Sequence, residues 1–341
     1  MKQHLAAKWY SLTRKLPVYW VLIIALLAAI PYNLYINHFN LPIAHNEDVK
    51  DDCNLPYNLV SDKNNRLIHP ILFADVATED EKLMPLKEKI NIYLNTKKAE
   101  GLTSAAVYFN NLNNADGWFV INPDEKFNPA SMIKIAFMIA ILKEAEENPA
   151  ILDKKVFYAK HSEEYHDQAI LQHQLPPGKY YTIRELLQYA VSYSDNDAAF
   201  LILNNFKWSS LQKLIAELNL PPVELHTEYF LTAEQMSRFF RILYNGSYLS
   251  NDLSEYALTL LTKSDFNKGL IKNLDKNLIV ARKFGERGID KVRELHEYGI
   301  IYLKGNTYLI GIMTRGKDYA QLQEIIAEIS VIAYDEMAKT I

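Results

Sequence analysis

The chain has 341 residues, of which 49% are hydrophobic and 12% aromatic, enough to bury the core of one substantial domain with appendages or of two modest domains. Its formal net charge of -4 gives no basic surface of the kind that nucleic-acid binding requires, so we expect no nucleic-acid partner. The single cysteine, Cys53, excludes an internal disulfide framework and a cysteine-based zinc site.

The N-terminal residues have the pattern of a membrane anchor. Residues 1–16 carry four basic side chains, and residues 17–39 contain no Asp, Glu, Lys or Arg. We expect a basic cytoplasmic tail over 1–16 and a single-pass transmembrane signal anchor over 17–39, because the basic flank stays on the cytoplasmic side. The folded part would then be extracytoplasmic on the cell membrane. A cleaved signal peptide is the alternative, since residues 27–29 supply small side chains after a short apolar centre, and it also exports the folded part.

The remainder divides into a linker and a folded domain. Residues 40–78 are rich in Asn, Asp and Pro and show no sustained apolar period, which predicts an extracytoplasmic linker. From residue 79 to 341 the apolar patterns of helices and strands follow in turn. A helix is expected from about Leu83 to just before Gly101, and then a hairpin formed by strands 105–109 and 118–121.

Helical patterns dominate the middle of this domain. Residues 132–142 are apolar on every side except at Lys134, which predicts a helix enclosed within the fold. Residues 178–206 read as two more helices. Further predicted elements are amphipathic helices over 209–218 and 232–244, strands over 278–284, 298–303 and 308–314, and a closing helix over 318–339. The order predicts an α+β fold, with an antiparallel sheet covered by terminal helices and an all-helical lobe inserted over about 143–277.

Ser131 and Lys134 form a Ser-x-x-Lys pattern at the start of the buried helix. By itself the pattern is weak, because about one chance occurrence is expected in a chain of this length. Ser210 and Lys213 also fit it, but they open an amphipathic surface helix, where a serine is better explained as an N-cap. Ser131 differs because it lies where a helix start offers free N–H groups. Burial would lower the pKa of Lys134 and leave a fraction of it neutral, able to act as a base toward Ser131.

Two further patterns follow in chain order. Ser194, Asp195 and Asn196 stand between two predicted helices, and Lys283 opens a Lys-Phe-Gly run at the end of a predicted strand. Taken alone, the first would be an ordinary helix cap and the second an edge-strand charge. Only the ordered set of three patterns points to the site of a serine acyl-enzyme hydrolase.

With these residues the chain resembles the superfamily of class A β-lactamases and penicillin-binding proteins. The similarity includes residues 178–187 and 193–199, which look like the family's helix pair around its Ser-Asp-Asn turn, and it extends from about Thr103 to the C-terminus. It implies a β-lactamase/transpeptidase-like fold whose antiparallel sheet has five strands. It also implies an amide hydrolase that works through an acyl-serine intermediate and needs no metal or cofactor.

The resemblance assigns a role to each matched position. Ser131 would be the acylated nucleophile, Lys134 the general base, and Ser194 the relay of a proton to the leaving nitrogen. Asn196 would hold the amide side chain of the substrate, Lys283 would supply positive potential, and Gly285 would lie along the bound substrate. The oxyanion hole would come from the backbone N–H groups of Ser131 and Glu286.

Two departures from the family pattern bear on the substrate. Class A β-lactamases carry a glutamate on a long loop after the Ser-Asp-Asn turn, whereas residues 220–231 are too few for such a loop, and neither Glu224 nor Glu228 falls in its motif. Phe284 stands where the family has a hydroxyl that contacts the substrate carboxylate. Arg282 or Arg287 could replace it, because guanidinium groups pair well with carboxylates.

Three functions therefore remain open. The leading hypothesis is a membrane-anchored serine hydrolase that acts on β-lactams or on related cell-wall peptides. The alternatives are a D-alanyl-D-alanine carboxypeptidase and a non-catalytic protein that binds a cell-wall ligand. A metal site at the acidic and histidine-rich stretch from His161 to His173 is disfavoured, because its spacing is not the two-histidine helical pattern of metalloproteases.

Overall fold

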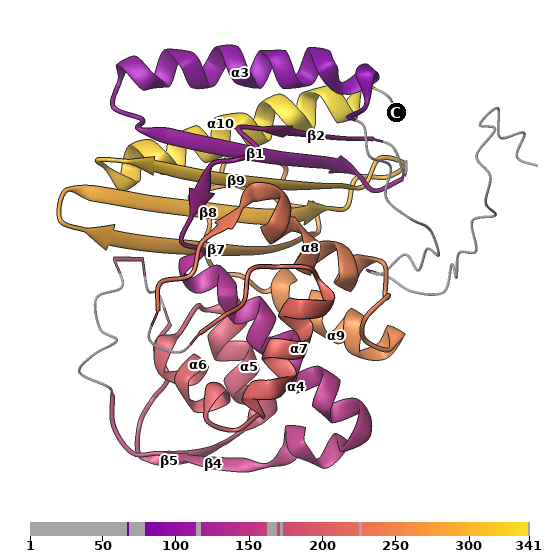
Figure 1. Cartoon of the computed structure of the whole chain (residues 1–341), viewed down its shortest axis with the longest axis vertical. Coiled ribbons are helices and arrows are strands. Elements are labelled where there is room, and N and C mark those ends of the chain that lie inside the picture. The colour runs from indigo at the N-terminus through magenta and orange to yellow at the C-terminus, as the bar shows by residue number, and fades with distance from the viewer. Residues whose placement is uncertain are drawn as a thin grey trace, which may run out of the picture. The chain divides into compact units, whose positions relative to one another are not determined.

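The computed structural model describes residues 67, 79–113, 117–161, 169–170, 173–224 and 227–339 (Figure 1). The expected cytoplasmic tail and anchor lie outside the described residues, as does the expected linker apart from Leu67. Within the described part of the chain, no helix is long and apolar enough to cross a membrane.

A five-stranded antiparallel sheet forms the centre of the domain. Its strand order is β2-β1-β9-β8-β7, so the hairpin near the N-terminus pairs with the last strand and β7 is left at an edge. The strands are β1 (Ser104–Asn111), β2 (Trp118–Ile121), β7 (Val280–Ile289), β8 (Val292–Ile301) and β9 (Tyr308–Gly316). The predicted antiparallel sheet and α+β class are confirmed.

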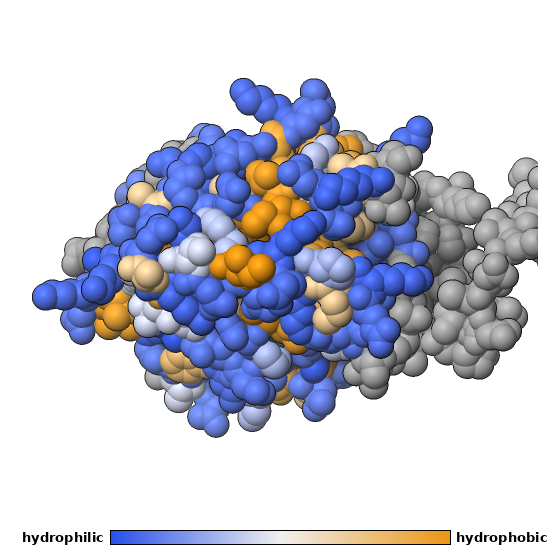
Figure 2. Space-filling model, turned by 90° about the horizontal axis from the view of Figure 1, so that it is seen from above, coloured by the Kyte–Doolittle hydropathy of each residue, from blue (hydrophilic) through white to orange (hydrophobic). Residues whose placement is uncertain are grey.

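Two long helices cover one face of this sheet, α3 (Met84–Ala99) and α10 (Tyr319–Ala338) (Figure 1). α3 begins with a proline in its first turn, and Asp318 caps α10 by accepting from the Gln321 N–H, so each start is locally encoded. Their buried side chains pack on the sheet in one hydrophobic cluster. The outer face is mostly hydrophilic, with a short central band of hydrophobic residues (Figure 2).

The other face of the sheet carries the helical lobe, which the chain enters after β3 (Lys126–Phe127) and leaves before β7 (Figure 1). Its helices are η2 (Ala130–Ile133), α4 (Lys134–Glu147), η3 (Pro149–Asp153), α5 (Ile183–Ser192), α6 (Asn196–Leu203), α7 (Trp208–Glu217), α8 (Ala233–Tyr244) and α9 (Asn251–Thr262). β3 pairs with β6 (Leu231–Thr232), and β4 (Lys155–Tyr158) pairs with β5 (Lys179–Thr182).

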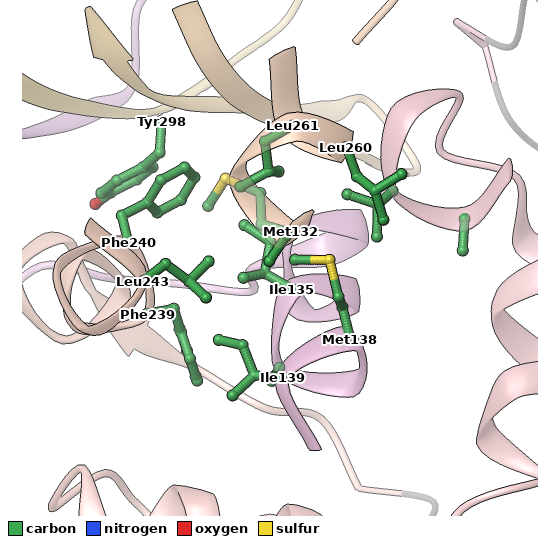
Figure 3. Packing of buried hydrophobic residues seen from close by; sticks show 14 of the residues in the cluster. Met132, Ile135, Met138, Ile139, Phe239, Phe240, Leu243, Leu260, Leu261 and Tyr298 are labelled. Atoms are coloured by element: carbon green, nitrogen blue, oxygen red, sulfur yellow. The ribbon is translucent and has the colours of Figure 1, made fainter. Parts of the chain in front are cut away.

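The predicted enclosure of α4 is confirmed. Met132 of η2 and Ile135, Met138 and Ile139 of α4 are fully buried, and they project toward side chains of α8 and α9 (Figure 3). Because α4 is held by neighbours on several sides, its first turn has a fixed place beneath the sheet.

Several elements differ from the predictions. Lys179–Thr182 is a strand rather than the start of a helix, because it pairs with β4, and Thr182 then caps α5 in a capping box with Glu185. α9 was not predicted. The N-cap reading of Ser210 is wrong: α7 begins after Lys207, and the Ser210 hydroxyl donates to Glu144 Oε1 at 2.6 Å.

Candidate active site

Ser131 lies in η2, directly before α4. The preceding residue, Ala130, has a φ of 48°, a left-handed conformation that costs a non-glycine residue roughly 1–2 kcal/mol. Asn128 supports this turn, because its Oδ1 accepts a hydrogen bond from the Ala130 N–H at 2.9 Å. The strained turn therefore fixes the direction in which the helix start presents Ser131.

A buried histidine holds the same turn against the sheet. The Nδ1 atom of His296 accepts from the Thr314 N–H at 3.2 Å, so the ring is neutral with its proton on Nε2, which donates to the Asn128 carbonyl at 3.1 Å. Burial lowers the pKa of His296 to about 3, so it stays neutral across the physiological range. His296 thus connects β8 and β9 to the segment that precedes Ser131.

Gly285 allows β7 to approach that segment closely. A Cβ atom at this position would lie 2.6 Å from the Pro129 carbonyl oxygen and 3.1 Å from the Met132 nitrogen, far inside normal contact distance. Glycine therefore lets the edge of β7 lie against η2, which brings the backbone of Gly285 and Glu286 to the turn that carries Ser131. The predicted pair of oxyanion donors, Ser131 and Glu286, comes from these two adjoining segments.

Lys134 begins α4, and it is buried. Its Nζ donates to the Ser194 carbonyl at 2.5 Å and to Asn196 Oδ1 at 2.7 Å. Burial lowers the pKa of Lys134 to about 7, although the nearby carboxylates of Asp195, Glu286 and Asp197 raise it in part. A large fraction of Lys134 is therefore neutral at pH 7 and able to take up a proton.

The Ser-Asp-Asn turn joins α5 to α6. Ser194 has a φ of 62°, a second left-handed non-glycine residue at the site. Asp195 is the N-cap of α6: its Oδ1 accepts from the Ala198 N–H and its Oδ2 from the Leu175 N–H. Both Asp195 oxygens are occupied in holding the turn, which leaves Ser194 and Asn196 directed at the lysines.

Lys283 reaches this turn from β7. Its Nζ donates to Ser194 Oγ at 2.7 Å and to the Phe284 carbonyl at 2.8 Å, and the side chain is fully buried. Burial, and in addition the positive charge of Lys134, place the pKa of Lys283 well below its ordinary value. Ser131, Lys134 and Asn196 line one pocket of about 220 Å³. The structure thus links the predicted residues Lys134, Ser194, Asn196 and Lys283 by hydrogen bonds and places Ser131 on the same pocket as Lys134.

This set contains a serine at a strained helix start, a buried lysine with a lowered pKa, and a second serine bonded to another lysine. Such groups can activate a hydroxyl nucleophile and return its proton to a leaving group. The sequence model of the beta-lactamase enzyme family matches residues 85–337. The chain belongs to the beta-lactamase enzyme family. As a member of this family it is a serine hydrolase.

A curated relative is similar to this hydrolase in sequence, and solved structures are similar to it in fold. Beta-lactamase VEB-1 of Pseudomonas aeruginosa is 23% identical over 263 residues, which cover 71% of this chain and 87% of the relative. The solved structure of PBP-A has a TM-score of 0.64 at 20% identity, covering 75% of this chain and 97% of that one. A beta-lactamase from Chitinophaga pinensis has the same TM-score and identity, covering 74% and 99%. These likenesses establish the β-lactamase-like α+β fold.

Phe284, which stands where the family has a hydroxyl, uses its ring in packing. The ring stacks on Phe266 at a centroid distance of 4.4 Å, and Lys283 Nζ lies over it, 4.5 Å from the centroid. Arg282 lies on the same side as Phe284 and is buried against Glu297, so its proposed role as a carboxylate ligand in this beta-lactamase-family site is wrong. Arg287 instead pairs with the exposed Glu228.

The sequence analysis assigned a role to the backbone N–H group of Glu286 and none to its carboxyl group. The Oε1 atom accepts from the Ile170 N–H at 2.8 Å, and burial raises the pKa of the carboxyl. Its Oε2 atom is buried without a hydrogen-bond partner among the described residues. In the sequence, the only signal was an acidic residue three positions after Lys283, on a strand edge next to a predicted site.

The sequence analysis also considered acidic and histidine side chains outside the three patterns. Glu224 and Glu228 are exposed on the segment between α7 and β6. Among the described residues, no three His, Cys, Asp or Glu side chains come together as metal ligands. His161 contacts Asp197 at 3.2 Å, and His173 contacts Asp265 at 2.7 Å; residues 162–168 lie outside the described ranges.

Proposed function

We propose that this hydrolase forms an acyl-enzyme at Ser131 with β-lactams or with a cell-wall peptide amide. The observation that carries the proposal is the position of Lys134, whose Nζ bonds to the Ser194 turn, has a pKa near neutrality and shares a pocket with Ser131. A neutral lysine there can accept the Ser131 proton at pH 7, which an ordinary exposed lysine cannot do.

The acylation step follows from these positions. Ser131 Oγ attacks the substrate carbonyl carbon while its proton passes to Lys134 Nζ. The backbone N–H groups of Ser131 and Glu286 stabilise the oxyanion that develops. The C–N bond then breaks, and Ser194 donates its hydroxyl proton to the departing nitrogen. Since Ser194 Oγ accepts from Lys283, the proton of Ser194 is directed away from Lys283. The proton that Lys134 took from Ser131 must then return to Ser194 Oγ, which leaves Lys134 neutral and Ser194 protonated as before.

Hydrolysis of the acyl-enzyme should be slower than its formation on a β-lactam. Three carboxylates lie near Lys134, and each already accepts a hydrogen bond: Asp195 from two backbone N–H groups, Asp197 from the Tyr158 hydroxyl at 2.6 Å, and Glu286 from the Ile170 N–H at 2.8 Å. Neither Glu224 nor Glu228 falls in the sequence motif of the family's deacylating glutamate. We therefore favour a penicillin-reactive peptidase, of the D-alanyl-D-alanine carboxypeptidase type, over a fast β-lactamase.

Intact-protein mass spectrometry after incubation with benzylpenicillin tests the proposal. We expect the wild-type mass to rise by the mass of one whole benzylpenicillin, because ring opening releases no fragment, and the adduct to persist for minutes. The Ser131→Ala variant should show no adduct. Rapid conversion of benzylpenicillin to penicilloate with no accumulating adduct would favour the β-lactamase alternative. A wild-type protein that neither gains mass nor turns the compound over would contradict acyl transfer and favour the non-catalytic binder.

We also propose that residues 17–39 anchor the hydrolase in the cell membrane, with its folded domain outside the cytoplasm. Residues 17–39 are uncharged and follow the basic residues 1–16, which supports an anchor. The proposed substrates belong to the cell wall, which supports a domain outside the cytoplasm. Fractionation of cells should place the full-length chain in the membrane pellet, and protease added outside the cytoplasmic membrane should digest the domain. Deletion of residues 1–39 should move it to the soluble fraction. A mature protein in the periplasm or medium that starts after residue 29 would contradict the anchor.

A further inference from the structure

Two exposed aromatic rings lie side by side on the two-stranded ribbon formed by β4 and β5. Phe157 and Tyr180 are direct cross-strand partners, 50% and 65% exposed, and their ring centroids are 5.0 Å apart. The ribbon lies at the end of the helical lobe that is farthest from the five-stranded sheet (Figure 1). Neither ring lines the pocket of Ser131. Large apolar side chains that gather on a surface often mark an interaction site.

The opposite face of the ribbon fixes it to the lobe. Tyr158 and Tyr181 are buried on that face, where the Tyr158 hydroxyl donates to Asp197 Oδ2 and the Tyr181 hydroxyl to the Pro176 carbonyl, each at 2.6 Å. Successive residues of a strand alternate between its two faces, so the exposed aromatic pair is directed to solvent. The pair adds a cross-strand contact to the ribbon but is not what attaches it to the lobe.

Exposed lysines flank the aromatic pair at both ends of the ribbon. Lys154 and Lys155 lie at one end, and Lys160 and Lys179 lie at the other, about 10 Å away along the strands. None of the four forms an ion pair with any residue that the structure describes. The two rings therefore lie between two cationic groups whose charges are not neutralised by these residues.

Nearby acidic side chains do not cancel this charge. Asp153 pairs with Arg184 at 3.0 Å, and Glu185 accepts from the backbone N–H and the hydroxyl of Thr182. Residues 162–168, which include further acidic side chains, lie outside the described ranges. The described part of this surface has an excess of positive charge, which favours an anionic partner.

We propose that the ribbon binds an anionic sugar polymer of the cell wall through the aromatic pair and the flanking lysines. The face of an aromatic ring is electron-rich, so it attracts the weakly positive C–H groups on the face of a sugar ring. Lysines at the two ends of the ribbon can pair with carboxylates that the sugars carry. The choice of a sugar polymer over other polyanions rests on the proposed function, because such a polymer carries the cell-wall peptides. Binding at the ribbon raises the local concentration of these peptides around the hydrolase.

Binding of cell-wall glycan strands stripped of their peptides tests the proposal. The full-length Ser131→Ala protein serves as the background, because it cannot be acylated and the strands offer its active site no peptide amide. The double variant Phe157→Ser/Tyr180→Ser should bind the strands about tenfold more weakly, since it loses two stacking contacts. Lys155→Gln/Lys179→Gln should bind them about fivefold more weakly and with a smaller dependence on salt concentration.

Matched variants on α3 control for lost apolar surface and for lost charge. Ile92→Ser removes an exposed apolar side chain there, and Lys89→Gln/Lys98→Gln removes two exposed cations. Both should bind the strands as tightly as the Ser131→Ala background does. Circular dichroism checks that every variant keeps the fold, and the lysine pair tests the ribbon even if the aromatic variant unfolds.

Two further ligands separate the sugar rings from the charge. Chitin oligosaccharides, whose sugar rings carry no carboxylate, should bind more weakly than the strands, and so should polyglutamate, which has carboxylates and no sugar rings. Polyglutamate that binds as tightly as the strands would show a non-specific polyanion site and overturn the proposal. Equal binding of the strands by the background and by both ribbon variants, or no binding at all, would also overturn it. Acylation of the wild type at Ser131 is measured independently, so the proposed function stands or falls separately.

Discussion

Replacement of Lys134 by methionine is expected to lower the second-order rate constant for acylation of Ser131 by about 10³-fold, within the range that a positioned general base supplies. Methionine keeps the length and the apolar stem of the side chain but cannot accept a proton. It also removes the hydrogen bonds to the Ser194 carbonyl and to Asn196. Since a buried ammonium group is costly, the variant should fold with a melting temperature equal to or above that of the wild type.

The pH dependence of acylation in the wild type gives a second test of Lys134 as the general base. A base with a pKa of about 7 is deprotonated in about a tenth of the molecules at pH 6 and in about nine tenths at pH 8. The acylation rate constant should therefore rise with pH, by about tenfold across this interval, with its midpoint near pH 7. The residual rate of Lys134→Met should show no such midpoint.

Lys143 provides a matched control on the same helix. Its Nζ bonds to Glu146 and to the Tyr248 carbonyl, away from Ser131. Lys143→Met should keep the wild-type rate constant and the wild-type pH profile. If Lys134→Met acylates within threefold of the wild type, or if the wild-type profile is flat from pH 6 to 8, Lys134 is not the base.

The candidate catalytic residues could be found in the sequence because short-range patterns mark them. A lysine on an otherwise apolar helix start, and a Ser-Asp-Asn run between two helices, are visible without knowledge of the fold. The structure adds how Lys134 reaches the Ser194 turn, since Nζ bonds to a carbonyl and an amide there, and no hydrogen bond joins it to Ser131 among the described residues. Hydrogen-bond partners of this kind depend on backbone direction, which residue spacing does not specify.

Features that depend on long-range packing were not predictable in the same way. β5 forms only because Lys179–Thr182 meets β4 across a connection of many residues, which overrode its apparent helical pattern. The pocket of about 220 Å³ beside Ser131 arises where α4 and α6 lie next to each other. The sequence pattern of neither helix alone predicts it. The direction of Arg282, by contrast, was predictable: strand residues alternate between faces, so Arg282 could not share the face of Lys283.

The buried ion pair of Arg282 and Glu297 is expected to make a large contribution to stability. The Arg282 guanidinium pairs with Glu297 at 3.1 Å, and both side chains are almost completely buried. It also donates to the carbonyl groups of Phe266 and Ser264, while Glu297 Oε2 accepts from the Leu270 N–H at 2.7 Å. This ion pair therefore fastens residues 264–270 to β7 and β8, and with them the ring that stacks on Phe284.

Arg282→Met should lower the free energy of unfolding by about 3–5 kcal/mol, because it leaves Glu297 buried without its counter-charge. Burial already raises the pKa of Glu297, and Arg282 is the largest influence that opposes this rise. Without Arg282 the carboxyl should take up a proton at higher pH, and the double variant Arg282→Met/Glu297→Gln should recover part of the loss. Urea unfolding followed by circular dichroism measures each difference.

Arg293 is the matched control that tests whether charge burial causes the loss of stability in Arg282→Met. It lies on β8, and its guanidinium donates to the carbonyl groups of Asp290 and Val292 at the exposed end of the β7–β8 hairpin. Arg293→Met should lower the free energy of unfolding by less than about 1 kcal/mol, as expected for a half-buried cation at the end of a hairpin. An Arg282→Met variant no less stable than Arg293→Met would show that the buried pair does not hold residues 264–270 in place. In that case the packing of Phe266 on Phe284 alone would have to keep this edge of β7 beside Ser194.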